Sequence, residues 1–455
     1  MSTVTCQLWN ERDVDTPPLY LQGHVAPVAR EIEGRDLAVR GALPPELDGR
    51  YFRNGPNPRP GEDPGHWFTG PGMLHGIRLE GGRARWYRNR WIRTAAFDGA
   101  PRYKPDGSPD PAVSPANTSV IRHGGRILAL VETGLPYEVS PELDTLGPFD
   151  FGGRLTTAMT AHPKQDPATG DLHFFGYGAV PPYLTYHRAT ADGRLVESRE
   201  VRVPGPTMMH DFAITEHHVI WLDLPVVFDP HLLGRTIPYR WDDAYRARLG
   251  VMEQRGDAPV RWYEVEPGYV FHIGNAREDP DGRIKLDAVR YNRDAFARTW
   301  GSIGGVGDSS GPRISPNDRP TLYCWILDPA TGRAVEQPLD DRAIEFPTLN
   351  DAHVGRSSRY RYAVRDDGVV KYDLTLGSAS RYDAGEGQAP GEAVFVPAAD
   401  DRAEDAGWLL TIVSDRAGRG SELQVLDAAD LRLTAAVPLP QRVPAGFHGA
   451  WLPQP

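Results

Sequence analysis

The most regular feature of the chain is a short run of alternating apolar and polar residues, followed by a turn built on Asp, Pro, Thr or Gly and a second such run. Alternation with a period of two is typical of a half-buried β-strand, so each copy predicts a β-hairpin. Five copies lie at residues 137–147, 184–198, 323–335, 370–382 and 423–433. Further strand-like runs lie between them, and an all-β fold follows.

The hairpins recur at a nearly constant spacing. Taking Tyr137, Tyr186, Trp325, Tyr372 and Val425 as equivalent points, the intervals are 49, 139, 47 and 53 residues. A repeat of roughly 50 residues with several strands per unit predicts a β-propeller. The long interval has room for two or three more units, so six or seven blades fit the length.

Two segments differ from this pattern. Asp242 to Met252 is predicted to form a short helix, and Gly301 to Gly311 a flexible Gly/Ser loop with no core to bury. Neither segment marks a domain boundary that would interrupt the repeat.

Composition supports a turn-rich, folded chain. Gly (48) and Pro (43) together make one residue in five of 455, while 40% of the residues are hydrophobic, which is far more than a disordered chain carries. The net charge of −11 is spread without a basic block, which argues against nucleic-acid binding. Neither a signal peptide nor a long apolar span is visible, so we expect a soluble cytoplasmic protein.

Candidate chemistry is limited by what the sequence lacks. The two cysteines, Cys6 and Cys324, are too few for a disulfide framework or a thiolate metal site, so a bound metal would need His or carboxylate ligands. The zinc-peptidase, phosphate-loop and serine-hydrolase motifs are absent. In a propeller, ligands for a central metal come singly from several blades. The residues alone do not choose among the 14 histidines, since any one of them is more often a surface or core residue.

From about Leu43 to the C-terminus the chain resembles the carotenoid cleavage oxygenases, a family of non-heme iron dioxygenases on a seven-bladed propeller. Nine segments carry the resemblance, in family order. They are 43–58 (LPPELDGRYFRNGPNP), 67–75 (WFTGPGMLH), 128–137 (LALVETGLPY), 160–164 (TAHPK), 208–215 (MMHDFAIT), 269–276 (YVFHIGNA), 344–347 (IEFP), 392–397 (EAVFVP) and 446–449 (GFHG). The resemblance implies one catalytic propeller domain over residues 43–455 with a central metal and a cap of loops and short helices. Residues 1–42 would then be an N-terminal arm packed on it.

The resemblance also implies a set of site residues. One Fe²⁺ per chain would be bound by His162, His210, His272 and His448, whose separations of 48, 62 and 176 residues are about one, one and three repeat units. Dioxygen would be the co-substrate. Three glutamates would accept hydrogen bonds from ligand rings; they are Glu132, Glu345 and Glu392. Thr118 corresponds to a position that crowds an open iron site, with a turn-forming Asn-Thr as the alternative.

The expected reaction is oxidative cleavage of a conjugated C=C bond of a carotenoid or apocarotenoid into two carbonyl products. In the stilbene-cleaving branch a Lys that engages the phenol precedes the first of these glutamates, and here that position is Val131, which favours a carotenoid. Stilbene or phenylpropanoid cleavage, and a non-cleaving metal-binding propeller, are the alternatives. The apolar stretch 225–241 is a candidate substrate entrance with peripheral membrane contact, or else a buried inter-blade loop. Tyr103 is a possible second phenol-binding residue. No obligate protein partner is predicted.

Overall fold

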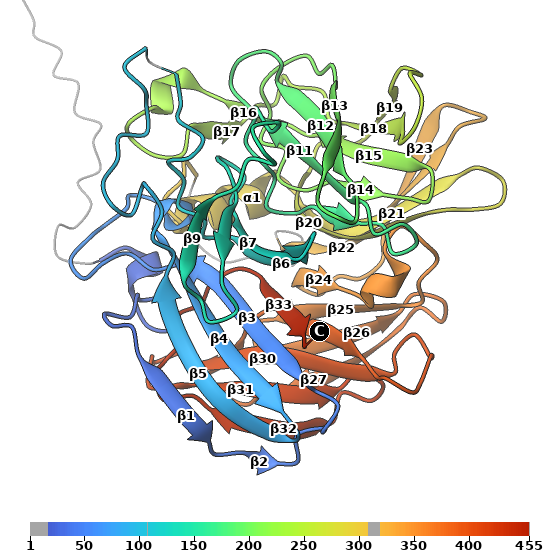
Figure 1. The fold of residues 1–455 in the computed structure, drawn as a ribbon. Helices are drawn as coiled ribbons and strands as arrows, with labels where there is room; N and C mark the ends of the chain where they lie inside the picture. The colour runs from blue at the N-terminus through green and yellow to red at the C-terminus, as the bar shows by residue number, and fades with distance from the viewer. Residues whose placement is uncertain (1–16, 107, 308–318, 455) are drawn as a thin grey trace, which may run out of the picture.

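The fold is a ring of seven antiparallel sheets, shown in Figure 1. The computed structural model describes residues 17–106, 108–307 and 319–454. Each sheet is one blade, and in most blades the strand that comes first in the chain is the innermost. The all-β, seven-bladed propeller predicted from the sequence is therefore confirmed.

The strands of the blades, from the innermost outward and in chain order of the blades, are as follows. Blade 1 holds β33 (Gly449–Pro453), β3 (Gly49–Pro56), β4 (Gly72–Glu80), β5 (Arg83–Trp91) and β1 (Glu33–Leu37); blade 2 holds β6 (Ser119–His123), β7 (Arg126–Leu130), β8 (Tyr137–Val139) and β9 (Thr145–Pro148); blade 3 holds β10 (Lys164–Gln165), β11 (Leu172–Tyr177), β12 (Leu184–Ala189) and β13 (Leu195–Glu200); blade 4 holds β14 (Ala213–Ile214), β15 (His218–Asp223), β18 (Arg248–Glu253) and β19 (Arg261–Glu264). Blade 5 holds β20 (Tyr269–Glu278), β21 (Ile284–Tyr291), β22 (Thr321–Asp328) and β23 (Arg333–Pro338); blade 6 holds β24 (Glu345–Thr348), β25 (Tyr360–Arg365), β26 (Gly368–Asp373) and β27 (Ser378–Asp383); blade 7 holds β28 (Gln388–Pro390), β29 (Val394–Pro397), β30 (Gly407–Asp415), β31 (Ser421–Asp427), β32 (Leu433–Pro438) and β2 (Arg40–Gly41).

The five predicted hairpins are confirmed: β8–β9, β12–β13, β22–β23 and β26–β27 are the two outermost strands of their blades, and β31–β32 lies one strand further in, because β2 pairs outside β32. Burial alternates along the outermost strands β13 and β23, whereas β12 and β26 are buried on both faces. Likewise, β4 is buried along almost its whole length, so its sequence does not alternate.

The long interval between hairpins holds fewer units than predicted. Among the described residues between 186 and 325 there is one further outer hairpin, β18–β19 of blade 4. The remaining length is used by a two-stranded ribbon of β16 (Val226–Phe228) and β17 (Tyr239–Trp241), and by the helix α1 (Arg293–Ser302). Insertions between strands, rather than extra blades, account for the spacing.

The predicted helix over 242–252 is wrong. Asp242 forms a turn, in which its side chain accepts a hydrogen bond from the backbone N–H of Ala244, and residues 248–253 then form strand β18. The helix instead begins after Asn292, whose side chain caps it by accepting from the N–H of Ala295. Pairing of β18 with β15 and β19 outweighs the local helical preference.

The predicted Gly/Ser loop over 301–311 is also different in the described part. Gly301 and Ser302 are the last residues of α1, and Gly305 and Gly307 pack tightly: a Cβ on them would lie 2.3 Å from the ring of Trp300 and 2.0 Å from a backbone oxygen. Residues 302–307 therefore cover a buried tryptophan, while 308–311 lie outside the described residues.

The ring is closed by the two ends of the chain. Strand β33, near the C-terminus, pairs antiparallel with β3, from Gly49 opposite Pro453 to Arg53 opposite Gly449, and the red strand lies beside the blue ones in Figure 1. Strands β1 and β2 add to the outer edges of blades 1 and 7. Within the described ranges, we find no helix with the length and apolar character needed to span a membrane.

Candidate metal centre

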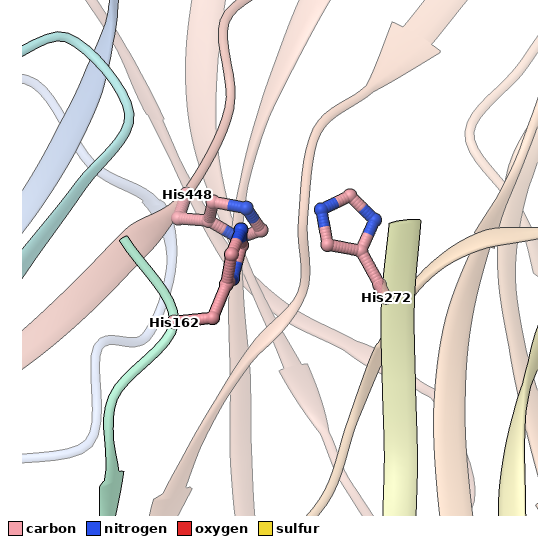
Figure 2. Close-up of side chains that lie close together, drawn as sticks. All are labelled: His162, His272 and His448. Atoms are coloured by element: carbon pink, nitrogen blue, oxygen red, sulfur yellow. The ribbon is translucent and has the colours of Figure 1, made fainter. Parts of the chain in front are cut away.

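The four predicted histidine ligands come from four different blades. His162 lies two residues before β10, His210 three residues before β14, His272 within β20, and His448 immediately before β33. Each of these is the innermost strand of its blade, so the four side chains reach the axis of the propeller from different directions. Figure 2 shows three of them, from separate segments of the chain, around one space.

The four imidazoles form one compact cluster. The Nε2 atoms of His162 and His210 are 3.0 Å apart, and ligand atoms of His162, His272 and His448 all lie within 4.8 Å of one another. Ring centroids of neighbouring imidazoles are 4.5 to 5.5 Å apart. Of the 14 histidines, the structure brings together the four that the family resemblance selects.

A break in the strand register accompanies His272. The pairing of β20 with β21 shifts between Val270 and Ile273 and again before Asn275, which leaves His272 in a bulge. A bulge changes the direction in which a side chain points. Strand β24 shifts likewise after Glu345, where Phe346 has a φ of 52°. Such a conformation is costly for a non-glycine residue, and strain of this kind is common at functional sites.

The three predicted glutamates lie against three of the rings. Oε2 of Glu132 is 2.7 Å from Nδ1 of His210, and Oε2 of Glu345 is 2.5 Å from Nδ1 of His272. Oε1 of Glu392 is 2.9 Å from Nδ1 of His448. Contact at Nδ1 directs the proton to that atom and leaves the Nε2 lone pair of each ring available to a metal.

Two of the glutamates have a second hydrogen-bond donor that holds them in place. The hydroxyl of Tyr291 donates to Glu345 at 2.7 Å, and the backbone N–H of Gly449 donates to Glu392 at 2.6 Å. Burial raises the pKa of the Tyr177 hydroxyl, and the nearby charge of Glu132 raises it further. The carboxylates of Glu345 and Glu392 are thus positioned independently of the rings that they orient. Tyr177 and Tyr291 were not among the predicted site residues.

Together the four histidines and three glutamates represent every blade. Blades 1, 3, 4 and 5 supply the histidines, while Glu132 follows β7 of blade 2, Glu345 begins β24 of blade 6, and Glu392 lies between β28 and β29 of blade 7. The arrangement explains why no short sequence motif contains the site.

Burial determines the charge state of the cluster. Burial lowers the pKa of His162 well below its ordinary value, and the neighbouring imidazoles lower it further. Burial likewise lowers the pKa of His448. At His272 burial acts in the same direction, but the charge and hydrogen bond of Glu345 outweigh it and raise the pKa. A proton therefore competes with a metal most strongly at His272.

The donor set fits a divalent transition metal. Among the described residues, Nε2 of His448 is buried and has no hydrogen-bond partner, which is costly unless a metal or water satisfies it. Neutral imidazole nitrogens suit Zn²⁺, Cu²⁺, Ni²⁺ and Fe²⁺.

Aromatic side chains surround the cluster. The ring of Phe271 is 5.3 Å from that of His210, and Phe346 lies 4.9 Å from His272. Phe68 packs 5.1 Å from Phe447, which directly precedes His448. These phenylalanines were not among the predicted site residues. Their position in the sequence was a usable signal, because three of the four are adjacent to a predicted site residue.

The remaining predicted residues are placed as follows. Thr118 is buried, and its carbonyl accepts a hydrogen bond from the backbone N–H of His448 at 3.2 Å. Val131 is buried next to Glu132 in the chain. Tyr103 lies half exposed on a loop where it forms an isolated bridge with Pro109.

The apolar stretch 225–241 forms the β16–β17 ribbon, seen at the upper edge of Figure 1. Val226 is fully buried, whereas Leu233, between the two strands, is 49% exposed. The ribbon is therefore neither a wholly buried loop nor a wholly exposed patch.

Comparison with known proteins gives consistent matches over nearly the whole chain. Residues 25–453 match the family model described as retinal pigment epithelial membrane protein. A carotenoid cleavage oxygenase of Mycobacterium tuberculosis is 39% identical, over 95% of this chain and 97% of its own length. Carotenoid 9,10(9',10')-cleavage dioxygenase 1 of Arabidopsis thaliana is 32% identical, over 97% of this chain and 91% of its own.

Relatives with other substrates in their names match comparably. Isoeugenol monooxygenase of Pseudomonas nitroreducens is 31% identical, over 96% of this chain and 98% of its own. Among solved structures, the lignostilbene dioxygenase of Pseudomonas brassicacearum superposes with a TM-score of 0.84 at 28% identity, covering 97% of this chain and 99% of that one. The resemblance seen in the sequence is confirmed, and the chain belongs to the family of carotenoid cleavage oxygenases.

Proposed function

We propose that this protein is an iron(II) dioxygenase that cleaves a conjugated C=C bond of a carotenoid or apocarotenoid, adding one oxygen atom of dioxygen to each carbon to give two carbonyl products. The observation that carries the proposal is the cluster of four imidazoles in which three are contacted at Nδ1 by partly or fully buried glutamates. His162, His210, His272 and His448 would bind one Fe²⁺ per chain. When bound, the iron would supply the activation of dioxygen.

The chain's own residues would provide positioning. Glu132, Glu345 and Glu392 keep the three rings in the tautomer that presents Nε2 to the metal. The aromatic side chains of Phe68, Phe271 and Phe346 would contact an apolar polyene and keep water from the site. Thr118, which hydrogen-bonds to the segment of His448, would restrict access to one side of the metal.

The proposed substrate class is a carotenoid or apocarotenoid. Val131 offers no group that could polarise or deprotonate a phenol, which favours a carotenoid over a hydroxystilbene. Stilbene or phenylpropanoid cleavage is the second candidate, because relatives named for isoeugenol and lignostilbene match along almost the full chain. The β16–β17 ribbon, with Leu233 exposed, would be the place where the protein takes an apolar substrate from a membrane surface.

The test is anaerobic reconstitution with Fe²⁺, followed by dioxygen and a panel of all-trans apocarotenals and hydroxystilbenes. We expect loss of polyene absorbance and shorter aldehydes in the product mass spectrum. Preference for hydroxystilbenes would contradict the interpretation of Val131. If none of the compounds in the panel is cleaved, the proposed dioxygenase activity is contradicted.

Metal analysis separates the enzyme from a non-cleaving propeller. The wild type should retain close to one iron per chain, and His210→Ala should lose most of it. Retention of iron by His210→Ala would mean that the metal is bound elsewhere.

A further inference from the structure

Two of the proposed ligands precede very short strands. β10 and β14, which follow His162 and His210, have two residues each and pair with their neighbours at two positions only. A ladder of this length supplies few of the backbone hydrogen bonds at this place, so contacts outside it contribute to the position of the ligands. Among the described residues, no ion pair joins His162 to a carboxylate, unlike the other three histidines.

One buried carboxylate joins the segments concerned. Asp211 directly follows His210 and is 3% exposed. Its Oδ1 lies 2.8 Å from Nζ of Lys164, two residues after His162, and its Oδ2 accepts from the backbone N–H of Ile273, directly after His272, at 2.9 Å. Oδ1 also accepts from the N–H of Phe212 at 2.8 Å.

These contacts connect three consecutive blades. Lys164 belongs to β10 of blade 3, Asp211 lies before β14 of blade 4, and Ile273 lies in β20 of blade 5, between its two register shifts. The backbone N–H of Ile273 donates to Asp211, so the carboxylate holds β20 at the point where its pairing with β21 is irregular. Charge-assisted hydrogen bonds of this kind are stronger than neutral ones.

We propose that Asp211 is a positioning residue of the metal centre, which sets the spacing of the segments that carry His162, His210 and His272 through Lys164 and the N–H of Ile273. The inference rests on the proposed metal-binding function and adds a residue that touches no ligand ring. Asp211 acts through the backbone, whereas the three glutamates act on the imidazoles.

The test measures binding of Co²⁺ to apoprotein by titration, together with the visible absorption spectrum of bound Co²⁺, which reports ligand geometry. Asp211→Asn keeps the shape and one acceptor oxygen but loses the charge that pairs with Lys164. We expect a roughly 10- to 100-fold weaker affinity and an altered spectrum, as for other residues that support metal ligands. Lys164→Met removes the other half of the pair, and its affinity should fall in the same direction.

A matched control is the Lys371–Asp405 pair, which is also a partly buried Lys–Asp contact and lies in blades 6 and 7. Asp405→Asn should lower the melting temperature but leave Co²⁺ affinity within about two-fold of wild type. If Asp211→Asn does not fold, Lys164→Met and its spectrum decide the question.

The outcomes separate this inference from the function on which it rests. A wild type that binds no Co²⁺ would contradict both. A wild type that binds, with Asp211→Asn and Lys164→Met showing unchanged affinity and spectra, would overturn only the positioning role.

Discussion

Oε1 of Glu392 lies 2.9 Å from Nδ1 of His448, while Nε2 of the same ring is buried without a partner. The carboxylate therefore sets which nitrogen of His448 faces the centre of the site. Glu392→Gln keeps an acceptor oxygen but removes the negative charge, so we expect roughly 10-fold weaker Co²⁺ binding, measured by titration of apoprotein.

The control for Glu392→Gln is Glu138→Gln, which breaks the surface contact with Arg126. Its Co²⁺ affinity should equal that of the wild type. An equal loss in both variants would indicate a general effect of removing charge and would contradict a specific role for Glu392.

Gly274 lies two residues after His272 at a place with no room for a side chain. A Cβ there would be 1.9 Å from Oδ2 of Asp287 and 2.7 Å from Nε of Arg361, which form a buried ion pair at 2.7 Å. Gly274→Ala should therefore destabilise the protein by about 2 kcal/mol or more, measured by urea unfolding.

Gly420→Ala is the corresponding control, because a Cβ at that position meets nothing within 4 Å and the backbone is not in the left-handed region. We expect a change within about 0.5 kcal/mol. Equal stability of the two variants would mean that the backbone of β20 moves freely enough to accept the methyl group.

The sequence alone predicts more of the fold than of the site. Outer hairpins such as β22–β23 could be predicted because burial alternates along their strands. The innermost strands β10 and β14 could not, since they have two residues each and are too short to show a periodic pattern. The helix was misplaced because pairing of β18 across two neighbours outweighs local preference.

The histidines became identifiable only through the family resemblance. The bulge that directs His272 inward and the segment before β10 that carries His162 depend on pairing with a neighbouring strand, which a local pattern does not encode. Asp211 shows the same limit, because its partners Lys164 and Ile273 are 47 and 62 residues away in the chain. Contacts between residues this far apart in the chain become visible only in the folded structure.

Leu452 lies in β33, the strand that closes the ring, and is 5% exposed in a cluster with Phe52 and Leu74. Leu452→Ala should cost about 2–5 kcal/mol of stability, although it lies near the end of the chain, because it leaves a cavity beneath the closing strand. His448 is on the same segment, so Co²⁺ binding should weaken as well.

For Leu452→Ala the comparison is Leu433→Ala in β32, where the side chain is 42% exposed. That variant should unfold at nearly the wild-type urea concentration. A small effect at Leu452 would indicate that closure depends on the backbone pairing of β33 with β3 rather than on packing.

Glu278, at the end of β20, joins blade 5 to blade 4 through hydrogen bonds with Thr215, His217 and His218. Burial acts to raise the pKa of Glu278, but these hydrogen bonds outweigh it and lower the pKa from 4.5 to about 2. A depressed carboxyl pKa stabilises the folded state at pH values above the ordinary pKa, and the contribution disappears as the pH falls toward the folded pKa.

Glu278→Gln should therefore lose about 2 kcal/mol of stability near neutral pH, and the difference from wild type should shrink steadily below about pH 4.5. Urea unfolding of both proteins across this range measures it, with Glu264→Gln, whose carboxylate is 78% exposed, as a control that should follow the wild type throughout. A difference between Glu278→Gln and wild type that stays constant down to the lowest pH at which both fold would show that the side chain acts by packing and not by its charge.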